Sequence, residues 1–161
     1  MLEFETRKVD CPVCGETVDM PLDILGAMAQ MPGLVAKSFQ ASARSGGEGW
    51  MPNEVAAHLA DVEVTLGWRI RQVLSEDEPL LQPFDQEVWA RALEYGERDL
   101  ETSLATYSAN RKSNLELLQR AGDGGLDRKY RHPQFGNRPL RAFIEHIADH
   151  DVLHLRQIRG E

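Results

Sequence analysis

The sequence predicts an all-α fold built as a single helical bundle. Apolar residues recur at intervals of three and four in every long segment, which is the period of an amphipathic helix, and none of these segments alternates as a strand does. The 161 residues suffice for one well-buried core and are too few for two ordinary domains. We therefore expect one helical domain over residues 21–161, preceded by an N-terminal tail over residues 1–20.

Acidic residues outnumber basic residues, with 26 Asp and Glu against 18 Lys and Arg and a net charge of -8 at pH 7. Such a surface repels phosphate backbones, so we expect no nucleic-acid partner. The start, MLEFETRKVD, is mostly charged and polar, unlike a signal peptide, and the sequence contains no apolar run of membrane-spanning length. We expect a cytoplasmic protein with no membrane association.

The predicted tail carries both cysteines of the chain, Cys11 and Cys14, in the stretch DCPVCGE. This C-x-x-C-G pattern is half of a zinc knuckle, in which two thiolates converge from a turn closed by Gly15. A structural zinc ion needs four ligands, and the chain has no second cysteine pair. We favour a reduced thiol pair in a mobile tail, and the alternative is a metal or redox site completed by a histidine or by a second subunit.

The first helix is expected to begin near Pro32. Apolar positions between residues 21 and 44 have helical spacing, but Pro32-Gly33 interrupts them, and proline is tolerated only in a first helical turn. Residues 43–49, ARSGGEG, read as a loop.

The clearest helix spans residues 50–74, with Pro52 in its first turn and Glu54 near the positive end of its dipole. His58 lies on the edge of its apolar stripe and points into the bundle. A histidine bonded to a core neighbour is the alternative to a metal ligand at this position. Residues 75–87 read as a connection, followed by about one helical turn over 87–92.

A third long helix is predicted over residues 99–121 and ends at AGDGG. Arg111 falls on its apolar stripe, where a guanidinium is costly unless it is paired or reaches water. We favour a side chain that extends to the surface over a charged group in an internal cleft. Residues 126–140 read as a loop.

The final helix runs from near Pro139 to near Arg159 and carries three histidines, His146, His150 and His154. Histidines four residues apart can direct ring nitrogens at one point, and imidazole binds zinc, nickel and iron. His146 and His154 are about 12 Å apart along the helix axis, so they cannot bind one ion. His150 and His154 are therefore the candidate pair.

Four stretches resemble motifs of the DinB-like superfamily, including its YfiT-type members, and follow one another in the same order as in that family. They are WMPNEVAAHLADVE, FDQEVW, RKSNLELLQR and HPQFGNRPLRAFIEHIADHDVLHLRQI. The resemblance runs from about Trp50 to Arg159 and does not cover CPVCGE. It implies a four-helix bundle, often a homodimer, with a divalent metal ion held by His58, His150 and His154. Met51 stands where a capping Ser or Thr is common, and Leu153 stands where members often have a histidine.

The resemblance also implies a metal-dependent enzyme acting on a small molecule, with zinc or nickel favoured and iron as an alternative. We favour activation of a low-molecular-weight thiol for S-transfer to an electrophile. The alternatives are a metal-dependent hydrolase and a non-catalytic bundle that binds a partner. Beside the ligands, Asp151 and Arg111 are candidates for supporting the site, with Asp151 reaching across to His58 or to a metal-bound water. The alternative for Asp151 is a solvated acid on the flank of the helix.

Overall fold

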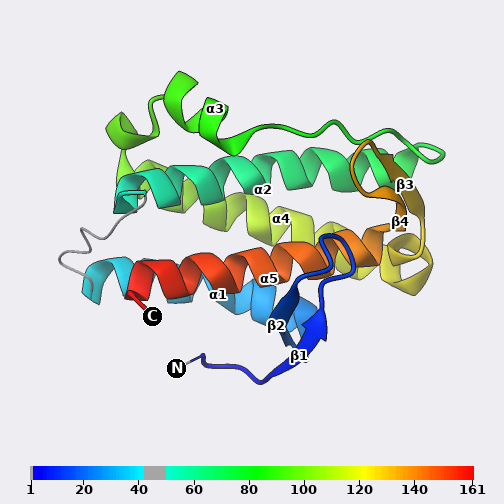
Figure 1. The fold of residues 1–161 in the computed structure, drawn as a ribbon, viewed down its shortest axis with the longest axis horizontal. Coiled ribbons are helices and arrows are strands. Elements are labelled where there is room, and N and C mark those ends of the chain that lie inside the picture. Colours follow the sequence, from blue (N-terminus) through cyan, green and yellow to red (C-terminus); the bar gives the residue numbers. More distant parts are fainter. Residues whose placement is uncertain (1, 42–49) are drawn as a thin grey trace.

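The computed structural model describes residues 2–41 and 50–161. Four long helices lie side by side (Figure 1). The elements are β1 (Thr6–Asp10), β2 (Thr17–Pro21), α1 (Ile24–Ala41), α2 (Pro52–Ser75), α3 (Gln86–Ala92), the 3-10 helix η1 (Tyr95–Glu97), α4 (Leu100–Leu126), β3 (Lys129–His132), β4 (Gly136–Pro139) and α5 (Leu140–Arg159). The predicted helical bundle is confirmed, and the loop predicted at residues 43–49 lies outside the described residues. Among the described residues, no helix has both the length and the apolar character of a membrane span.

Helix α1 begins eight residues before Pro32, so the predicted start near this proline is wrong. Proline lacks the N–H that would bond the carbonyl four residues earlier, which here belongs to Met28. The Nη1 atom of Arg111 donates to that carbonyl at 3.1 Å. A cation from another helix thus replaces the missing helical hydrogen bond, and the helix continues through the proline.

Residues 126–140, predicted as a loop, contain an antiparallel hairpin in which Lys129 pairs with Pro139 and His132 with Gly136. Gly136 has a φ of 69°, which suits the turn. The strands have four residues each, and within β3 only Tyr130 is buried. Strands this short bury too few positions to produce a visible alternation in the sequence. The hairpin is hydrogen-bonded to the segment that precedes α3, because the N–H of Leu81 donates to the carbonyl of Arg131 at 2.9 Å.

Residues 1–20, predicted as a tail, include β1 and most of β2, which form a second hairpin in register from Thr6–Pro21 to Asp10–Thr17. This hairpin lies against α5 (Figure 1). In its turn, Val13 packs against Ala142 of α5, and Asp19 of β2 pairs with Arg156 of α5 at 2.9 Å. The hairpin therefore contacts the same helix that carries the three histidines.

The apolar core consists of two main clusters along the bundle. Leu66, Ile70 and Phe143 belong to one cluster, and Leu59 and Leu155 belong to the other. Helix α2 packs against α4, and α1 packs against α5. Between the two clusters the bundle encloses polar side chains from α2, α4 and α5, and these side chains include the candidate site.

Candidate metal centre

The three histidines selected from the sequence meet inside the bundle, His58 from α2 and His150 and His154 from α5. The Nε2 atom of His150 lies 2.9 Å from Nε2 of His58 and 3.1 Å from Nε2 of His154. One nitrogen from each ring lies within 4.8 Å of the others. His58 and His154 are buried, and His150 is half-buried. The apolar stripes of α2 and α5 face each other, so packing alone brings the rings together.

This arrangement fits a divalent metal ion. Two imidazole nitrogens bound at about 2.1 Å in tetrahedral geometry lie about 3.4 Å apart, so the rings need to separate by only a few tenths of an ångström. Burial lowers the pKa of His58 to about 3, with a further contribution from His154. Burial also lowers the pKa of His154 and, together with the neighbouring histidines, that of His150. The rings are therefore neutral at pH 7, which is the form that binds a metal.

One of the three rings is held by a partner on its other nitrogen. The Nδ1 atom of His154 lies 2.8 Å from Oε1 of Gln157, which makes Nδ1 the protonated nitrogen and leaves Nε2 free as a ligand. The Nδ1 atoms of His58 and His150 are buried, and neither has a hydrogen-bond partner among the described residues. The Trp50 ring lies edge-on against His58, with 4.8 Å between ring centroids.

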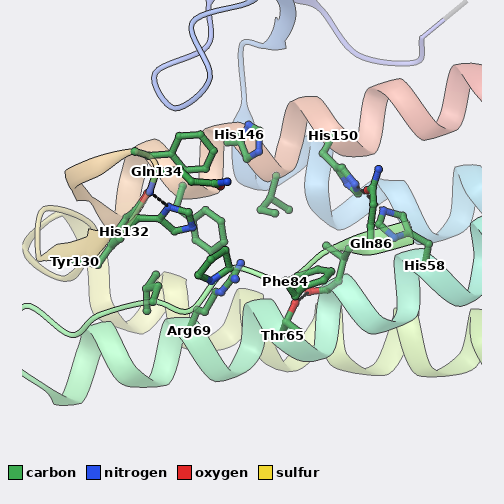
Figure 2. A pocket seen from close by; sticks show the side chains of 16 residues that line it. His58, Thr65, Arg69, Phe84, Gln86, Tyr130, His132, Gln134, His146 and His150 are labelled. Carbon is green, nitrogen blue, oxygen red and sulfur yellow. Dashed lines mark hydrogen bonds between the residues drawn. The ribbon is translucent and has the colours of Figure 1, made fainter. Parts of the chain in front are cut away.

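A cavity of about 240 Å³ opens beside the histidines. His58 and His150 line one end of it, and Tyr130 and His132 line the other (Figure 2). An ion held at the Nε2 atoms would therefore face a space large enough for a small molecule, because one water molecule occupies about 30 Å³.

Arg69 supplies a positive charge to this cavity. Its guanidinium donates to the carbonyl of Gln82 at 2.5 Å and lies over the rings of Phe84 and Phe143, 5.6 Å and 5.3 Å from their centroids. Among the described residues, no carboxylate forms an ion pair with it. The cavity thus combines aromatic walls with an unneutralised cation, which sequence reasoning missed because Arg69 reads as an ordinary position on the α2 stripe.

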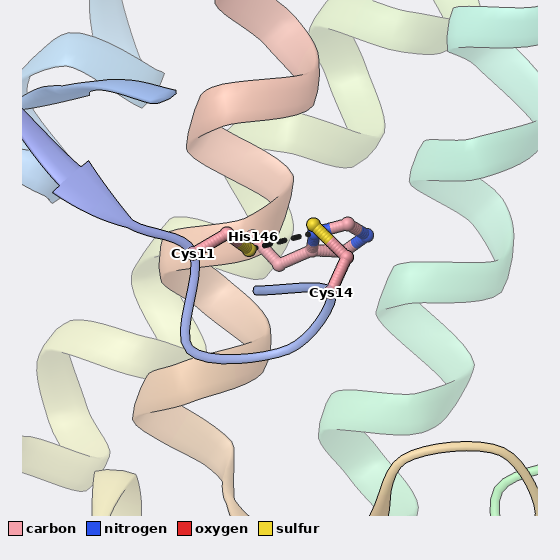
Figure 3. A group of neighbouring side chains, drawn as sticks. All are labelled: Cys11, Cys14 and His146. Atoms are coloured by element: carbon pink, nitrogen blue, oxygen red, sulfur yellow. Dashed lines mark hydrogen bonds between the residues drawn. The ribbon is translucent and has the colours of Figure 1, made fainter. Parts of the chain in front are cut away.

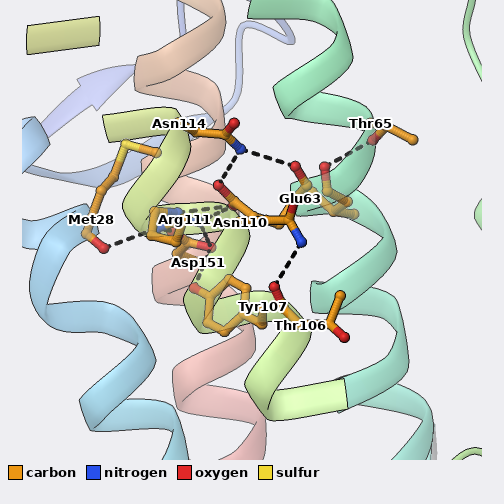
Figure 4. A network of polar contacts seen from close by, with 10 residues as sticks. Met28, Glu63, Thr65, Thr106, Tyr107, Asn110, Arg111, Asn114 and Asp151 are labelled. Carbon is orange, nitrogen blue, oxygen red and sulfur yellow. Dashed lines mark hydrogen bonds and ion pairs between the residues drawn. The ribbon is translucent and has the colours of Figure 1, made fainter. Parts of the chain in front are cut away.

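Arg111 does not extend to the surface, so the favoured interpretation of this residue is wrong. It is 1% exposed and occupies the centre of a polar network (Figure 4). Its Nη2 atom lies 2.7 Å from Oε2 of Glu63, and its Nη1 atom lies 2.7 Å from Oδ2 of Asp151. Asn114 donates to Oε1 of Glu63 at 2.8 Å, and Tyr107 donates to Oδ1 of Asp151 at 3.2 Å. The internal charged group weighed as the alternative is the one observed.

Asp151 is directed into this network, where it accepts hydrogen bonds from Arg111 and Tyr107. It acts on the histidines only through its charge, which raises the pKa of His154 against the effect of burial. A role for Asp151 or Arg111 in orienting a ligand histidine stays a prediction. Sequence reasoning missed Glu63, which is fully buried. A signal was present, because Glu63 follows Leu59 by four residues and precedes Leu66 by three, so it lies on the apolar stripe.

Cys11 and Cys14 lie in the turn between β1 and β2, and the third member of their group is His146 of α5. The Nδ1 atom of His146 therefore faces Cys11, while the residue also lines the cavity beside the cluster of three histidines. A partner histidine for the cysteine pair was one of the interpretations left open.

Comparisons with known proteins agree with this geometry. The family model described as the DinB superfamily matches residues 39–158. A protein of Oceanobacillus iheyensis, named "putative metal-dependent hydrolase", is 30% identical over 122 residues, which cover 76% of this chain and 69% of the relative. A protein of Bacillus mycoides with the same descriptive name is 25% identical over 143 residues, which cover 89% of this chain and 79% of that relative.

A solved structure matches as well. YfiT from Bacillus subtilis is described as a probable metal-dependent hydrolase with an unusual four-helix bundle topology. It matches with a TM-score of 0.77 at 21% identity, and the match covers 85% of this chain and 82% of that one. This likeness confirms the four-helix bundle, and the family match extends over most of the described helices. The chain belongs to the DinB superfamily.

Proposed function

We propose that this protein is a metal-dependent hydrolase of a small molecule, with the ion held by His58, His150 and His154. The observation that carries the proposal is the convergence of three neutral Nε2 atoms at the end of a cavity. Two relatives and one structural neighbour carry names or descriptions of metal-dependent hydrolases, which supports the same reaction class. Zinc and nickel suit three imidazoles best, and iron is the third candidate.

Three protein ligands leave a coordination position free, as catalytic zinc sites do and structural zinc sites do not. A bound divalent ion supplies a Lewis acid, which brings the pKa of a coordinated water molecule towards neutrality. The chain's own residues orient the ligand rings and keep them in the form that binds a metal. Gln157 fixes the orientation of His154, Trp50 packs against His58, and burial keeps the rings unprotonated.

Arg69 indicates the substrate class. Its guanidinium lies over two phenylalanine rings, and in the described part of the chain its hydrogen-bond partner is a backbone carbonyl rather than a carboxylate. A substrate with a carboxylate or another anionic group would neutralise Arg69 while its apolar part covers the aromatic wall. We therefore propose an anionic small molecule with an ester, amide or similar bond placed towards the histidines.

A thiol in the place of water is the second candidate, and it gives S-transfer to an electrophile. Arg69 favours it, because low-molecular-weight thiols commonly carry carboxylates that would pair with a guanidinium. The cavity volume of about 240 Å³ is also several times the volume of one water molecule, so the cavity has room for a small thiol.

The experiment measures turnover by the purified full chain loaded with zinc or nickel. A panel of anionic esters, amides and electrophiles is offered with and without low-molecular-weight thiols. We expect turnover that is lost after chelation and in His154→Ala. Product released in water alone supports hydrolysis, whereas product formed only with consumption of thiol supports S-transfer.

The matched control is His132→Ala, a cavity histidine outside the cluster of three. It should keep the ion that His154→Ala loses, as measured by elemental analysis. Equal loss in both variants, or a fully loaded protein that turns over nothing in either arm, would overturn the proposal and leave a metal-stabilised bundle that binds a partner.

A further inference from the structure

A second group of metal-ligating side chains lies one helical turn before the first along α5. Cys11 and Cys14 project from the β1–β2 turn towards His146 (Figure 3). The Sγ atom of Cys11 lies 3.3 Å from Nδ1 of His146, although 135 positions separate the two residues in sequence. One ligand atom from each of the three residues lies within 4.8 Å of the others.

The turn has the backbone of a metal knuckle. The N–H of Gly15 donates to the carbonyl of Cys11 at 2.9 Å, and the N–H of Cys11 donates to the carbonyl of Glu16 at 2.7 Å. Gly15 has a φ of 79°, in the left-handed region that favours glycine. This closed turn brings two cysteines three positions apart to the same side, which is the purpose of the C-x-x-C-G spacing in zinc sites.

Packing fixes this turn on α5 independently of any ion. Cys11 is 3% exposed and packs with Val13 against Ala142, one helical turn before His146. At the other end of the hairpin, Asp19 pairs with Arg156 at 2.9 Å. The cysteines therefore lie at a defined place on the helix, opposite a histidine whose Nδ1 faces them.

We propose that Cys11, Cys14 and His146 form a second metal site, and that its ion is zinc. Two sulfur ligands and one imidazole are a soft set that suits zinc, whereas three imidazoles accept several first-row metals. The thiols bind as thiolates and release their protons to solvent. Cys14 is exposed, so water completes the fourth position on the open side.

This site is separate from the cluster of three histidines. His146 and His150 are one helical turn apart, but Nδ1 of His146 faces Cys11 while Nε2 of His150 faces His58 and His154. The two groups share no ligand. The inference therefore stands whether or not the first site is catalytic, and the fully loaded chain carries two ions.

Cobalt(II) is the probe that tells the two sites apart. The full chain is reduced, stripped of metal with a chelator and titrated with cobalt(II) without oxygen. Thiolate ligands give an intense sulfur-to-cobalt charge-transfer band in the near ultraviolet, which imidazole ligands alone do not. We expect this band in the wild-type chain, its loss on addition of zinc, and two zinc ions per chain by elemental analysis.

Cys14→Ser is the preferred variant because Cys14 is exposed, whereas Cys11 belongs to the packed turn. It should lose the band and one of the two zinc ions with an unchanged circular dichroism spectrum, and His146→Asn should do the same. The matched control is His150→Ala, which removes a ligand one turn away and should keep the band. A reduced wild-type chain without the band, or an undiminished band in Cys14→Ser, would overturn the proposal.

Discussion

The Arg111 network and the cluster of three histidines are both polar groups enclosed by the same bundle, yet they differ in how completely they are satisfied. Arg111 donates from Nε, Nη1 and Nη2, and its acceptors lie on α1, α2 and α5. In the histidine cluster, the Nδ1 atoms of His58 and His150 have no partner among the described residues. Folding does not usually leave buried polar atoms unpaired. Every N–H of the Arg111 guanidinium is therefore paired, whereas the histidine cluster keeps two unpaired ring nitrogens, on the side of each ring away from the converging Nε2 atoms.

The two groups also differ in charge. Burial raises the pKa of Glu63, and Arg111 opposes that effect. Burial lowers the pKa of Arg111, but the nearby Asp151, Tyr107 and Glu63 raise it more, and the result is well above its ordinary value. The guanidinium therefore stays charged beside its carboxylates, while the imidazoles stay neutral. Substitutions in either group, or a change of pH, test this difference.

The largest effect is expected for Arg111→Met. It leaves the Glu63 and Asp151 carboxylates buried without their cation, which typically costs about 3–5 kcal/mol of unfolding free energy. Urea denaturation of the metal-free protein measures it. Arg120→Met is the control, because Arg120 pairs with Glu116 at 3.1 Å on an exposed surface and should cost no more than about 1 kcal/mol. Similar losses in the two variants would show that the network is not stabilising as a unit.

A middle-sized effect is expected from pH in the metal-free protein. The pKa of His58 falls from 6.5 to about 3 on folding, so between these values the unfolded chain binds more protons. The stability that neutral His58 contributes is therefore present above pH 6.5 and is lost as the pH falls towards its folded-state pKa. His58 alone should account for about 2 kcal/mol between pH 7 and pH 5.

Denaturation curves at pH 7, 6 and 5 measure this effect, and His58→Gln should show a shallower decline. Equal stability of the wild-type protein at pH 7 and pH 5 would contradict a buried, neutral His58.

The smallest effect is expected for Gln157→Ala. It removes the partner of Nδ1 of His154 and leaves all three metal ligands in place, so zinc affinity should fall about tenfold. Gln157 is exposed, so the free energy of unfolding without metal should not change. Competition with a chromophoric chelator gives the affinity, and Gln119→Ala is the exposed control. An unchanged affinity would show that the imidazole is oriented by packing alone.

Helical periodicity was enough to predict the bundle and the candidate histidines, because both depend on which residues share a helix face. Two features escaped that reasoning for physical reasons. Pro32 continues a helix because Arg111, 79 positions later, supplies the donor that the proline removes. His146 meets Cys11 across 135 positions, and no local pattern contains such a contact. Glu63 could have been found, since it occupies a core position in the α2 pattern.

Helix α5 is held near its middle by contacts with three different elements. His146 meets the β1–β2 turn, His150 meets α2, and Asp151 meets α4. The helix cannot slide along its axis or rotate without breaking all three contacts at once, so local opening offers its central amides little access to solvent. In hydrogen–deuterium exchange, the middle of α5 should therefore exchange only when the whole molecule unfolds, more slowly than α3, which lies on the outside of the bundle.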